Sequence, residues 1–226
     1  MTPPVRFSAC SVAVVQIAGV LAALSFVNSA SAYADTASLP MPGIQIDDDN
    51  GRCTAGFAAQ GNDGSYYLLT SGHCDEHDGS LWTYGDEESL GYITASEKGG
   101  EGTDEHDAAI VRLEPGLGEP VGDVGGTYPV RDVLSAADIE VGAPFCKIGA
   151  VTGETCGAVT DVGDNVIEAS VFSLQGDSGS PGFIKNSDGT VSAVGILMSS
   201  PDGDDYTTYF TLVDPLLAKW GLTILS

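Results

Sequence analysis

Glycines and short apolar runs dominate this chain. Thirty of its 226 residues are glycine, and from residue 53 onward short apolar runs alternate with turn sequences such as Asn62-Asp63-Gly64 and Gly163-Asp164-Asn165. Short runs bounded by Gly, Asn and Asp are typical of strands joined by tight turns. The sequence therefore predicts an all-β fold, with strands at Thr54–Gln60, Ser65–Ser71, Leu81–Tyr84, Ser89–Ala95, Ala108–Glu114, Pro144–Ile148, Gly157–Val162, Asn165–Ala169, Gly182–Lys185, Val191–Met198 and Thr207–Thr211.

One helix is expected, near the end of the chain. Asp214 and Pro215 would begin it, and Gly221 would end it. Glycine and proline cluster between Pro115 and Val133, and we place the link between two halves of the chain there. The expected halves are residues 53–125 and 126–226.

The first 32 residues read as a secretory signal peptide. Arg6 precedes an apolar stretch from Ala9 to Val27, and small residues then offer cleavage after Ala32 or Ala34. The alternative is a retained membrane anchor, because about 19 apolar residues nearly span a bilayer. We expect a secreted protein without stable membrane association after cleavage. Residues 33–52 are expected to be an N-terminal segment or a short leader.

The mature chain is strongly acidic. Residues 1–32 contain one basic and no acidic side chain, so the remaining 194 residues carry seven basic and 32 acidic side chains, a net charge of −25. Such a surface repels nucleic acids and anionic lipids. We therefore expect no nucleic-acid partner, and we expect a monomer.

Four cysteines remain after residue 32: Cys53, Cys74, Cys146 and Cys156. An even number in an exported chain predicts two disulfides, and four cysteines allow three pairings. Pairing of near neighbours gives Cys53–Cys74 and Cys146–Cys156. Zinc binding is the alternative, but the chain has no C-x-x-C and no histidine at ligand spacing in its second half.

Three motifs supply a base, an acid and a nucleophile. They are Thr70-Ser71-Gly72-His73-Cys74, His106-Asp107-Ala108-Ala109-Ile110-Val111 and Gly176-Asp177-Ser178-Gly179-Ser180-Pro181. A serine hydroxyl needs a base within hydrogen-bond reach, and histidine suits neutral pH. Asp107 begins an apolar run, where a buried carboxylate needs a partner such as the ring N–H of His73.

Other side chains could be mistaken for these groups. His77 lies among acidic residues and is interpreted as a surface residue, whereas His106 and Asp107 would face opposite sides of one strand. In the third motif, Gly176 permits a backbone conformation that turns its N–H toward the same point as the N–H of Ser178. We expect these two groups to form an oxyanion hole.

The three motifs in this order resemble the chymotrypsin-like serine proteases, and in particular the short bacterial branch of streptogrisin and α-lytic protease type. The resemblance extends from about Cys53 to the terminal helix. It implies two six-stranded antiparallel β-barrels with His73, Asp107 and Ser178 in the cleft between them. It also implies peptide hydrolysis through an acyl-enzyme, without metal or organic cofactor. The step from Cys146 to Cys156 matches a disulfide loop of this branch.

The chain departs from this branch in three places. Ser180 stands where many relatives have glycine. Relatives carry arginine at the position of Lys147, where it pairs with the aspartate before the nucleophile, so we expect Lys147 to neutralise Asp177. The segment from Tyr33 to Arg52 is too short for the large pro-domain of streptogrisins, so the chain folds unaided or with a short leader.

Substrate preference is only faintly visible in the sequence. By the resemblance, Phe172 and Ser173 line the specificity pocket, and Ser199 and Ser200 pair with the substrate backbone. No acid stands at the pocket positions, which disfavours a preference for Arg or Lys, and the second half has no histidine, which disfavours a preference for Glu. We therefore expect the pocket to accept a medium apolar side chain of the substrate. The predicted function is a secreted serine endopeptidase acting on polypeptides. The alternatives are a non-catalytic binding protein on the same scaffold and an esterase-type acyl hydrolase.

Overall fold

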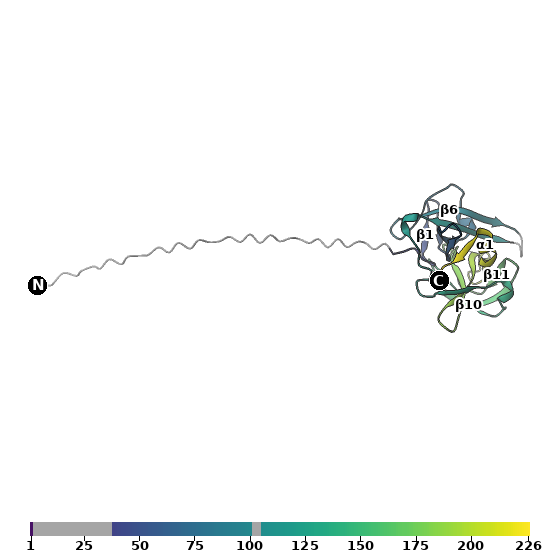
Figure 1. Cartoon of the computed structure of the whole chain (residues 1–226). Helices are drawn as coiled ribbons and strands as arrows, with labels where there is room; N and C mark the ends of the chain where they lie inside the picture. Colours follow the sequence, from purple (N-terminus) through teal and green to yellow (C-terminus); the bar gives the residue numbers. More distant parts are fainter. Residues whose placement is uncertain (2–37, 101–104) are drawn as a thin grey trace. The chain divides into compact units, whose positions relative to one another are not determined.

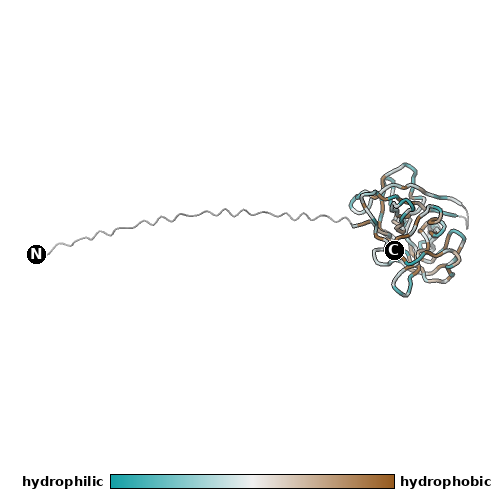
Figure 2. Tube along the Cα trace, in the orientation of Figure 1, coloured by the Kyte–Doolittle hydropathy of each residue, from teal (hydrophilic) through white to brown (hydrophobic). Residues whose placement is uncertain are grey.

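The computed structural model describes Met1, residues 38–100 and residues 105–226, and the folded part of the chain consists mostly of strands (Figure 1). The predicted signal peptide lies outside the described residues. Polar and apolar segments interchange along the folded trace, as expected for strands with one buried face (Figure 2). The all-β prediction is confirmed.

The strands of the first half form an eight-stranded sheet with β1, which precedes them, and β15 from the end of the chain, in the order β15-β3-β4-β7-β6-β5-β1-β2. Strand β2 leads into β3 through residues 55–57, and the N–H of Gly56 donates to the carbonyl of Leu69 at 2.6 Å. Because β2 and β3 are one continuous segment that pairs with β1 at one end and β4 at the other, the sheet curls back on itself. The strands are β1 (Gln45–Asp47), β2 (Arg52–Thr54), β3 (Ala58–Gly61), β4 (Tyr66–Thr70), β5 (Trp82–Tyr84), β6 (Glu88–Gly99), β7 (His106–Leu113) and β15 (Leu222–Ile224).

The second half closes into a barrel. Its sheet has the order β12-β9-β10-β11-β14-β13-β8, and an additional pairing of β12 with β13 closes a ring of six antiparallel strands. Strand β8 joins β13 in parallel, outside this ring. The strands are β8 (Val130–Val133), β9 (Pro144–Gly149), β10 (Gly153–Val162), β11 (Val166–Ala169), β12 (Pro181–Lys185), β13 (Val191–Ser199) and β14 (Thr208–Leu212).

The buried apolar side chains form three clusters, of which one joins the two halves. One cluster fills the first half around Trp82 and Leu90, and another fills the second half around Phe145 and Phe210. The third contains residues of both halves, including Phe57 and Phe183. Burial of apolar side chains is the main favourable term in folding, so this shared cluster fixes the two sheets against each other and holds the site that both contribute to.

The helix α1 (Val213–Trp220) is present where the sequence predicted it. Gly221 ends it with a φ of +63°, a conformation that glycine adopts without strain. In the part of the chain that the structure describes, no helix is long and apolar enough to cross a membrane.

The structure adds three short strands to those predicted: β1, β8 and β15. Strand β1 lies within the segment 33–52 and pairs with both β2 and β5, while β15 follows the helix and pairs with β3 of the first half. The predicted strand Thr54–Gln60 is interrupted at residues 55–57, and the strand predicted from Gly157 begins at Gly153.

Candidate active site

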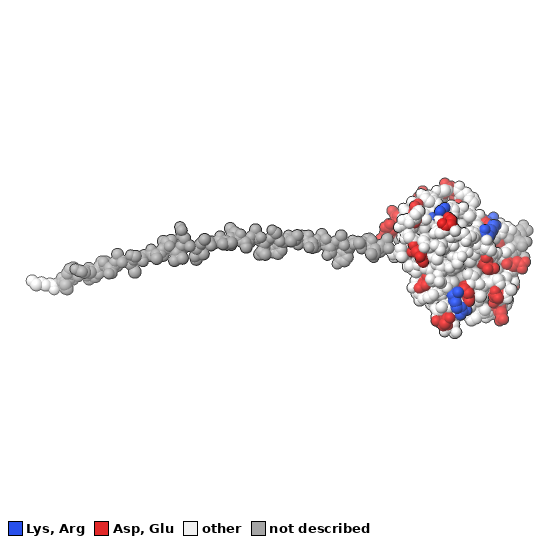
Figure 3. Space-filling view, in the orientation of Figure 1, with Lys and Arg blue, Asp and Glu red and all other residues white. Residues whose placement is uncertain are grey.

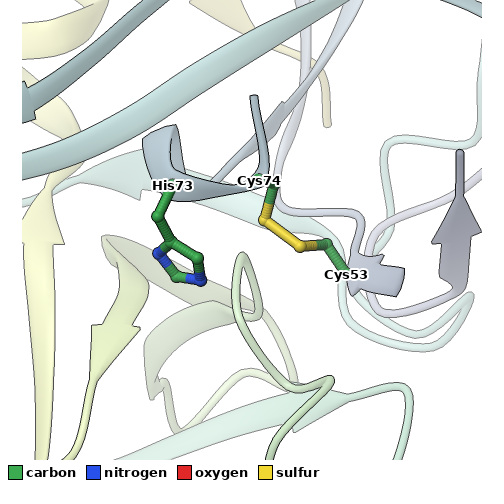
Figure 4. A group of neighbouring side chains, drawn as sticks. All are labelled: Cys53, His73 and Cys74. Carbon is green, nitrogen blue, oxygen red and sulfur yellow. A yellow bond between two sulfur atoms is a disulfide. The ribbon is translucent and has the colours of Figure 1, made fainter. Parts of the chain in front are cut away.

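His73 lies on a single turn of 3-10 helix, Gly72–Cys74, directly after β4. A Cβ atom at position 72 would lie 2.0 Å from the carbonyl oxygen of Glu97, so only glycine fits before the histidine. The turn is anchored by the disulfide Cys53–Cys74, which lies beside the imidazole ring (Figure 4). The second disulfide joins Cys146 to Cys156. Both predicted pairings are therefore confirmed.

Asp107 meets the histidine at the start of β7. Its side chain is buried, and its Oδ2 lies 2.6 Å from Nδ1 of His73. Its Oδ1 accepts a second hydrogen bond, also of 2.6 Å, from the backbone N–H of His73. The backbone N–H of Asp107 donates to Oγ1 of Thr211 at 3.0 Å. The carboxylate thus holds both the ring and the turn that carries it.

Ser178 lies in the loop between β11 and β12. Its Oγ is 2.9 Å from Nε2 of His73. The three predicted side chains therefore form one hydrogen-bonded row, from the carboxylate through the imidazole to the hydroxyl. His106 is directed elsewhere, with its Nε2 3.9 Å from a carboxylate oxygen of Glu97.

The loop around Ser178 has a tightly constrained backbone. Gly179 has a φ of +92°, and a Cβ there would lie 2.2 Å from the carbonyl oxygen of Thr54. Gly176 has a φ of +98°. Within the described residues, the backbone N–H groups of Gly176 and Ser178 have no hydrogen-bond partner. The fold itself therefore does not use either of the two predicted oxyanion donors.

Thr54 fastens this loop to the first half. Its N–H donates to the carbonyl of Ser178 at 2.7 Å, and its hydroxyl donates to the carbonyl of Gly176 at 2.8 Å. The same hydroxyl accepts from the N–H of Ala150 at 3.1 Å. The side chain is wholly buried. Thr54 could not be identified from the sequence, because its partners lie about one hundred residues away and no local pattern indicates them.

Asp177 and Lys147 form the predicted ion pair. Nζ of Lys147 lies 3.0 Å from Oδ2 of Asp177, and neither side chain is exposed. Burial raises the pKa of Asp177, but hydrogen bonds from the Thr152 hydroxyl and the Leu174 N–H, together with the ammonium, outweigh it and lower the pKa below its ordinary value. For Lys147, burial lowers the pKa because it disfavours the charged ammonium, although Asp177 opposes this.

The predicted substrate-binding residues lie in two places. Ser199 lines a cavity of about 440 Å³ that also borders His73, Asp107 and Ser178. Ser173 and Ser200 contact each other instead, with 3.0 Å between their hydroxyl oxygens, and Ser173 also lies 2.9 Å from Oγ1 of Thr208.

Phe172 packs against the ring of Tyr206, with 5.1 Å between centroids. Phe172, Ser173 and Ser200 do not line the two cavities that border Ser178. The segment predicted to line the specificity pocket is therefore packed against the loop that follows β13.

A second cavity borders the loop that carries Ser178, on the side of the disulfide Cys53–Cys74. It has a volume of about 590 Å³, and its lining includes His73, Ser178, Gly176 and Arg52. Cys53 and Cys74 lie close enough to His73 for metal ligation, but their sulfurs are joined to each other and offer no thiolate.

Similar proteins were found by sequence and by structure. The chain matches no protein-family model. The uncharacterized protein Rv1815 of Mycobacterium tuberculosis strain H37Rv is 29% identical over 180 residues, which cover 75% of this chain and 77% of that protein.

Among solved structures, Thermobifida fusca protease A has a TM-score of 0.65 at 23% identity, with 82% of this chain and 98% of that chain covered. The chymotrypsin of Cellulomonas bogoriensis has a TM-score of 0.62 at 25% identity, with 82% and 97% covered. The chain thus has the double-barrel fold of the bacterial chymotrypsin-like serine proteases, the family that its sequence motifs resemble.

Proposed function

We propose that the protein is a serine endopeptidase with Ser178 as nucleophile, His73 as general base and acid, and Asp107 as the residue that orients the histidine. The observation that carries the proposal is the row of contacts, 2.6 Å from Asp107 to Nδ1 and 2.9 Å from Nε2 to Oγ of Ser178. A carboxylate only accepts hydrogen bonds, so Nδ1 carries a proton and Nε2 is left to accept the proton of the serine hydroxyl.

The reaction follows from these positions. Ser178 Oγ attacks the peptide carbonyl carbon while its proton moves to Nε2 of His73. The N–H groups of Gly176 and Ser178 bind the oxyanion of the tetrahedral intermediate. The imidazolium then gives its proton to the leaving amine as the C–N bond breaks. Water, deprotonated by the same nitrogen, hydrolyses the acyl-enzyme.

Covalent labelling tests this proposal. An organophosphonate should add to Ser178 of the wild-type protein, as measured by intact mass and peptide mapping. His73→Ala should abolish labelling because the base is lost. His77→Asn is the matched control, since His77 is an exposed histidine that pairs with Asp75, and it should label at the wild-type rate. No labelling of the wild type would contradict the proposal and favour a binding protein on this scaffold.

Comparison of peptides with esters separates a peptidase from an esterase. A digest of a peptide library should yield internal cleavages that depend on Ser178. Hydrolysis of small esters without any peptide cleavage would identify an esterase-type acyl hydrolase instead.

We also propose that the mature protein is secreted, monomeric and active on polypeptides. Two disulfides support an oxidising compartment. N-terminal sequencing of the exported protein should find Tyr33 or Asp35 first. Trimming past Asp47 should abolish folding, because it would remove β1, which pairs on both of its edges.

A further inference from the structure

The basic side chains of the described residues fall into two groups. Five of the seven contact carboxylates: Arg112, Arg131, Lys147, Lys185 and Lys219. Arg52 and Lys98 have no ion pair within residues 38–100 and 105–226. In a chain with 32 acidic residues, a free guanidinium beside the nucleophile loop is available to bind another anion.

Arg52 lies on β2, next to a carboxylate with which it forms no ion pair. It stands opposite Asp47 in the antiparallel pair of β1 and β2, and opposite residues share one face of a sheet. Both carboxylate oxygens of Asp47, however, lie 2.9 Å from the side-chain amide nitrogen of Gln45. The Cδ of Arg52 lies 3.5 Å from where a Cβ on Gly176 would stand, so this side chain contacts the loop that carries Ser178.

Arg52 lines the cavity of about 590 Å³ together with His73 and Ser178. Two carboxylates line it as well. Asp48 is held within its own loop, where Oδ1 accepts from the N–H groups of Asn50 and Gly51, each at 2.9 Å. Glu76 is exposed. Arg52 is the basic residue among those that line this cavity, whereas the ammonium of Lys147 is buried and paired with Asp177.

The cavity lies on the leaving-group side of the proposed reaction. The backbone of the acyl part is expected to pair with Ser199 and Ser200, and Ser199 lines the other cavity that borders Ser178. The cavity with Arg52 contains no residue of β13 and is bounded by the disulfide Cys53–Cys74. A peptide that runs from one cavity to the other across Ser178 places its first residues after the scissile bond beside Arg52.

We propose that Arg52 binds a carboxylate carried by the substrate within two residues after the scissile bond. This inference rests on the proposed peptidase function. The planar guanidinium forms paired hydrogen bonds with a carboxylate, which a neutral amide cannot match. The carboxylate comes either from an Asp or Glu side chain or from the free C-terminus of a short peptide. The acidic surface of the molecule (Figure 3) repels anions over longer distances, so the preference is local to this cavity.

Matched peptides test the inference. The scissile sequence is taken from the library digest, and Glu, Gln or Lys is placed at each of the two positions after the cleaved bond. Each peptide is made with a C-terminal amide and as the free acid. The wild type should cleave the Glu peptides with a kcat/KM about tenfold above the Gln peptides. A preference only for short free acids would identify the C-terminal carboxylate as the group bound.

Two variants show whether Arg52 is responsible. Arg52→Gln should remove the preference for the carboxylate, and Arg52→Lys should restore part of it. Arg112→Gln removes the same charge from a remote exposed pair and should keep the wild-type preference. The inference is overturned if the wild type does not distinguish Glu from Gln and acid from amide, or if Arg52→Gln keeps the preference. Phosphonate labelling of Ser178 in the same samples tests the proposed function separately. Labelling without a carboxylate preference overturns only the role of Arg52, whereas loss of labelling in the wild type overturns the proposed function.

Discussion

Lys147 and Asp177 are ion-paired at 3.0 Å in the interior, directly beneath the loop that presents Ser178. Four further hydrogen bonds reach the carboxylate, from the N–H groups of Val151, Thr152 and Leu174 and from the hydroxyl of Thr152. The charge on Asp177 thus joins the loop before Ser178 to the turn between β9 and β10.

Removing the ammonium should destabilise the protein. We expect Lys147→Met to lower the free energy of unfolding by about 3–5 kcal/mol, because an uncompensated carboxylate would remain buried. Urea unfolding measures the loss. Lys147→Met/Asp177→Asn should recover part of it, since no charge is then left in the interior. A single variant with wild-type stability would contradict the role given to the pair.

Asp177 should also make stability depend on pH. Because its pKa in the folded protein lies below the ordinary value of 3.8, its contribution is complete above about pH 5 and is lost as the pH falls through the folded value. Asp177→Asn removes this contribution. The difference in unfolding free energy between wild type and variant should therefore be large at pH 7 and shrink below pH 4 in urea titrations. A difference that is constant from pH 7 to pH 3 would show that another group is responsible.

Asp107→Asn tests the orientation of the imidazole. The amide would favour the wrong tautomer of His73. In a chymotrypsin-like serine protease, the corresponding Asp→Asn change lowers kcat about 10⁴-fold. We expect a loss of this order with the fold retained, measured by peptide hydrolysis and circular dichroism. A variant within tenfold of the wild type would exclude Asp107 from the proposed mechanism.

Thr54→Val keeps the shape of the side chain but removes its hydroxyl. The carbonyl of Gly176 would lose its donor and the N–H of Ala150 its acceptor, which should cost about 1–3 kcal/mol of stability. Because this hydroxyl positions the loop with the proposed oxyanion donors, we expect kcat to fall while KM changes little. Thr54→Ser restores the hydroxyl and serves as the control. If Thr54→Ser loses as much kcat as Thr54→Val, the hydroxyl is not the cause.

The two disulfides should differ in their effect on activity. Each closes a short loop, with sequence separations of 21 and 10, and each should stabilise the fold by about 3 kcal/mol in the chain-entropy model. Cys53→Ala/Cys74→Ala also frees the turn that carries His73 and should lower kcat. Cys146→Ala/Cys156→Ala should lower the melting temperature without a comparable loss of kcat in the folded state. Equal losses of kcat in both double variants would contradict this difference.

Much of the site was predictable because its chemistry requires particular residue types in short motifs. His73 precedes a cysteine, and Asp107 precedes an apolar run. Ser178 lies between two glycines, which are typical of a tight loop. Each motif is local, so the order of the three along the chain could be compared with that of a known family. Alternation and turn residues likewise predicted most strands of both sheets.

What could not be predicted depends on partners distant in sequence. Thr54 is one threonine among many until the fold places it against Gly176. Strands β1 and β15 have three residues each, too few for alternation to distinguish them from loops. Arg52 cannot be singled out from the sequence. Only the structure shows that five other basic side chains contact carboxylates and that Arg52 has no such contact within the described residues.

The pairing of β15 with β3 also orders events during biosynthesis. The ribosome makes residues 222–224 after every other described strand, yet they complete the edge of the sheet whose next strands lead to His73 and Asp107. This edge of the sheet therefore cannot be completed before residues 222–224 have been made.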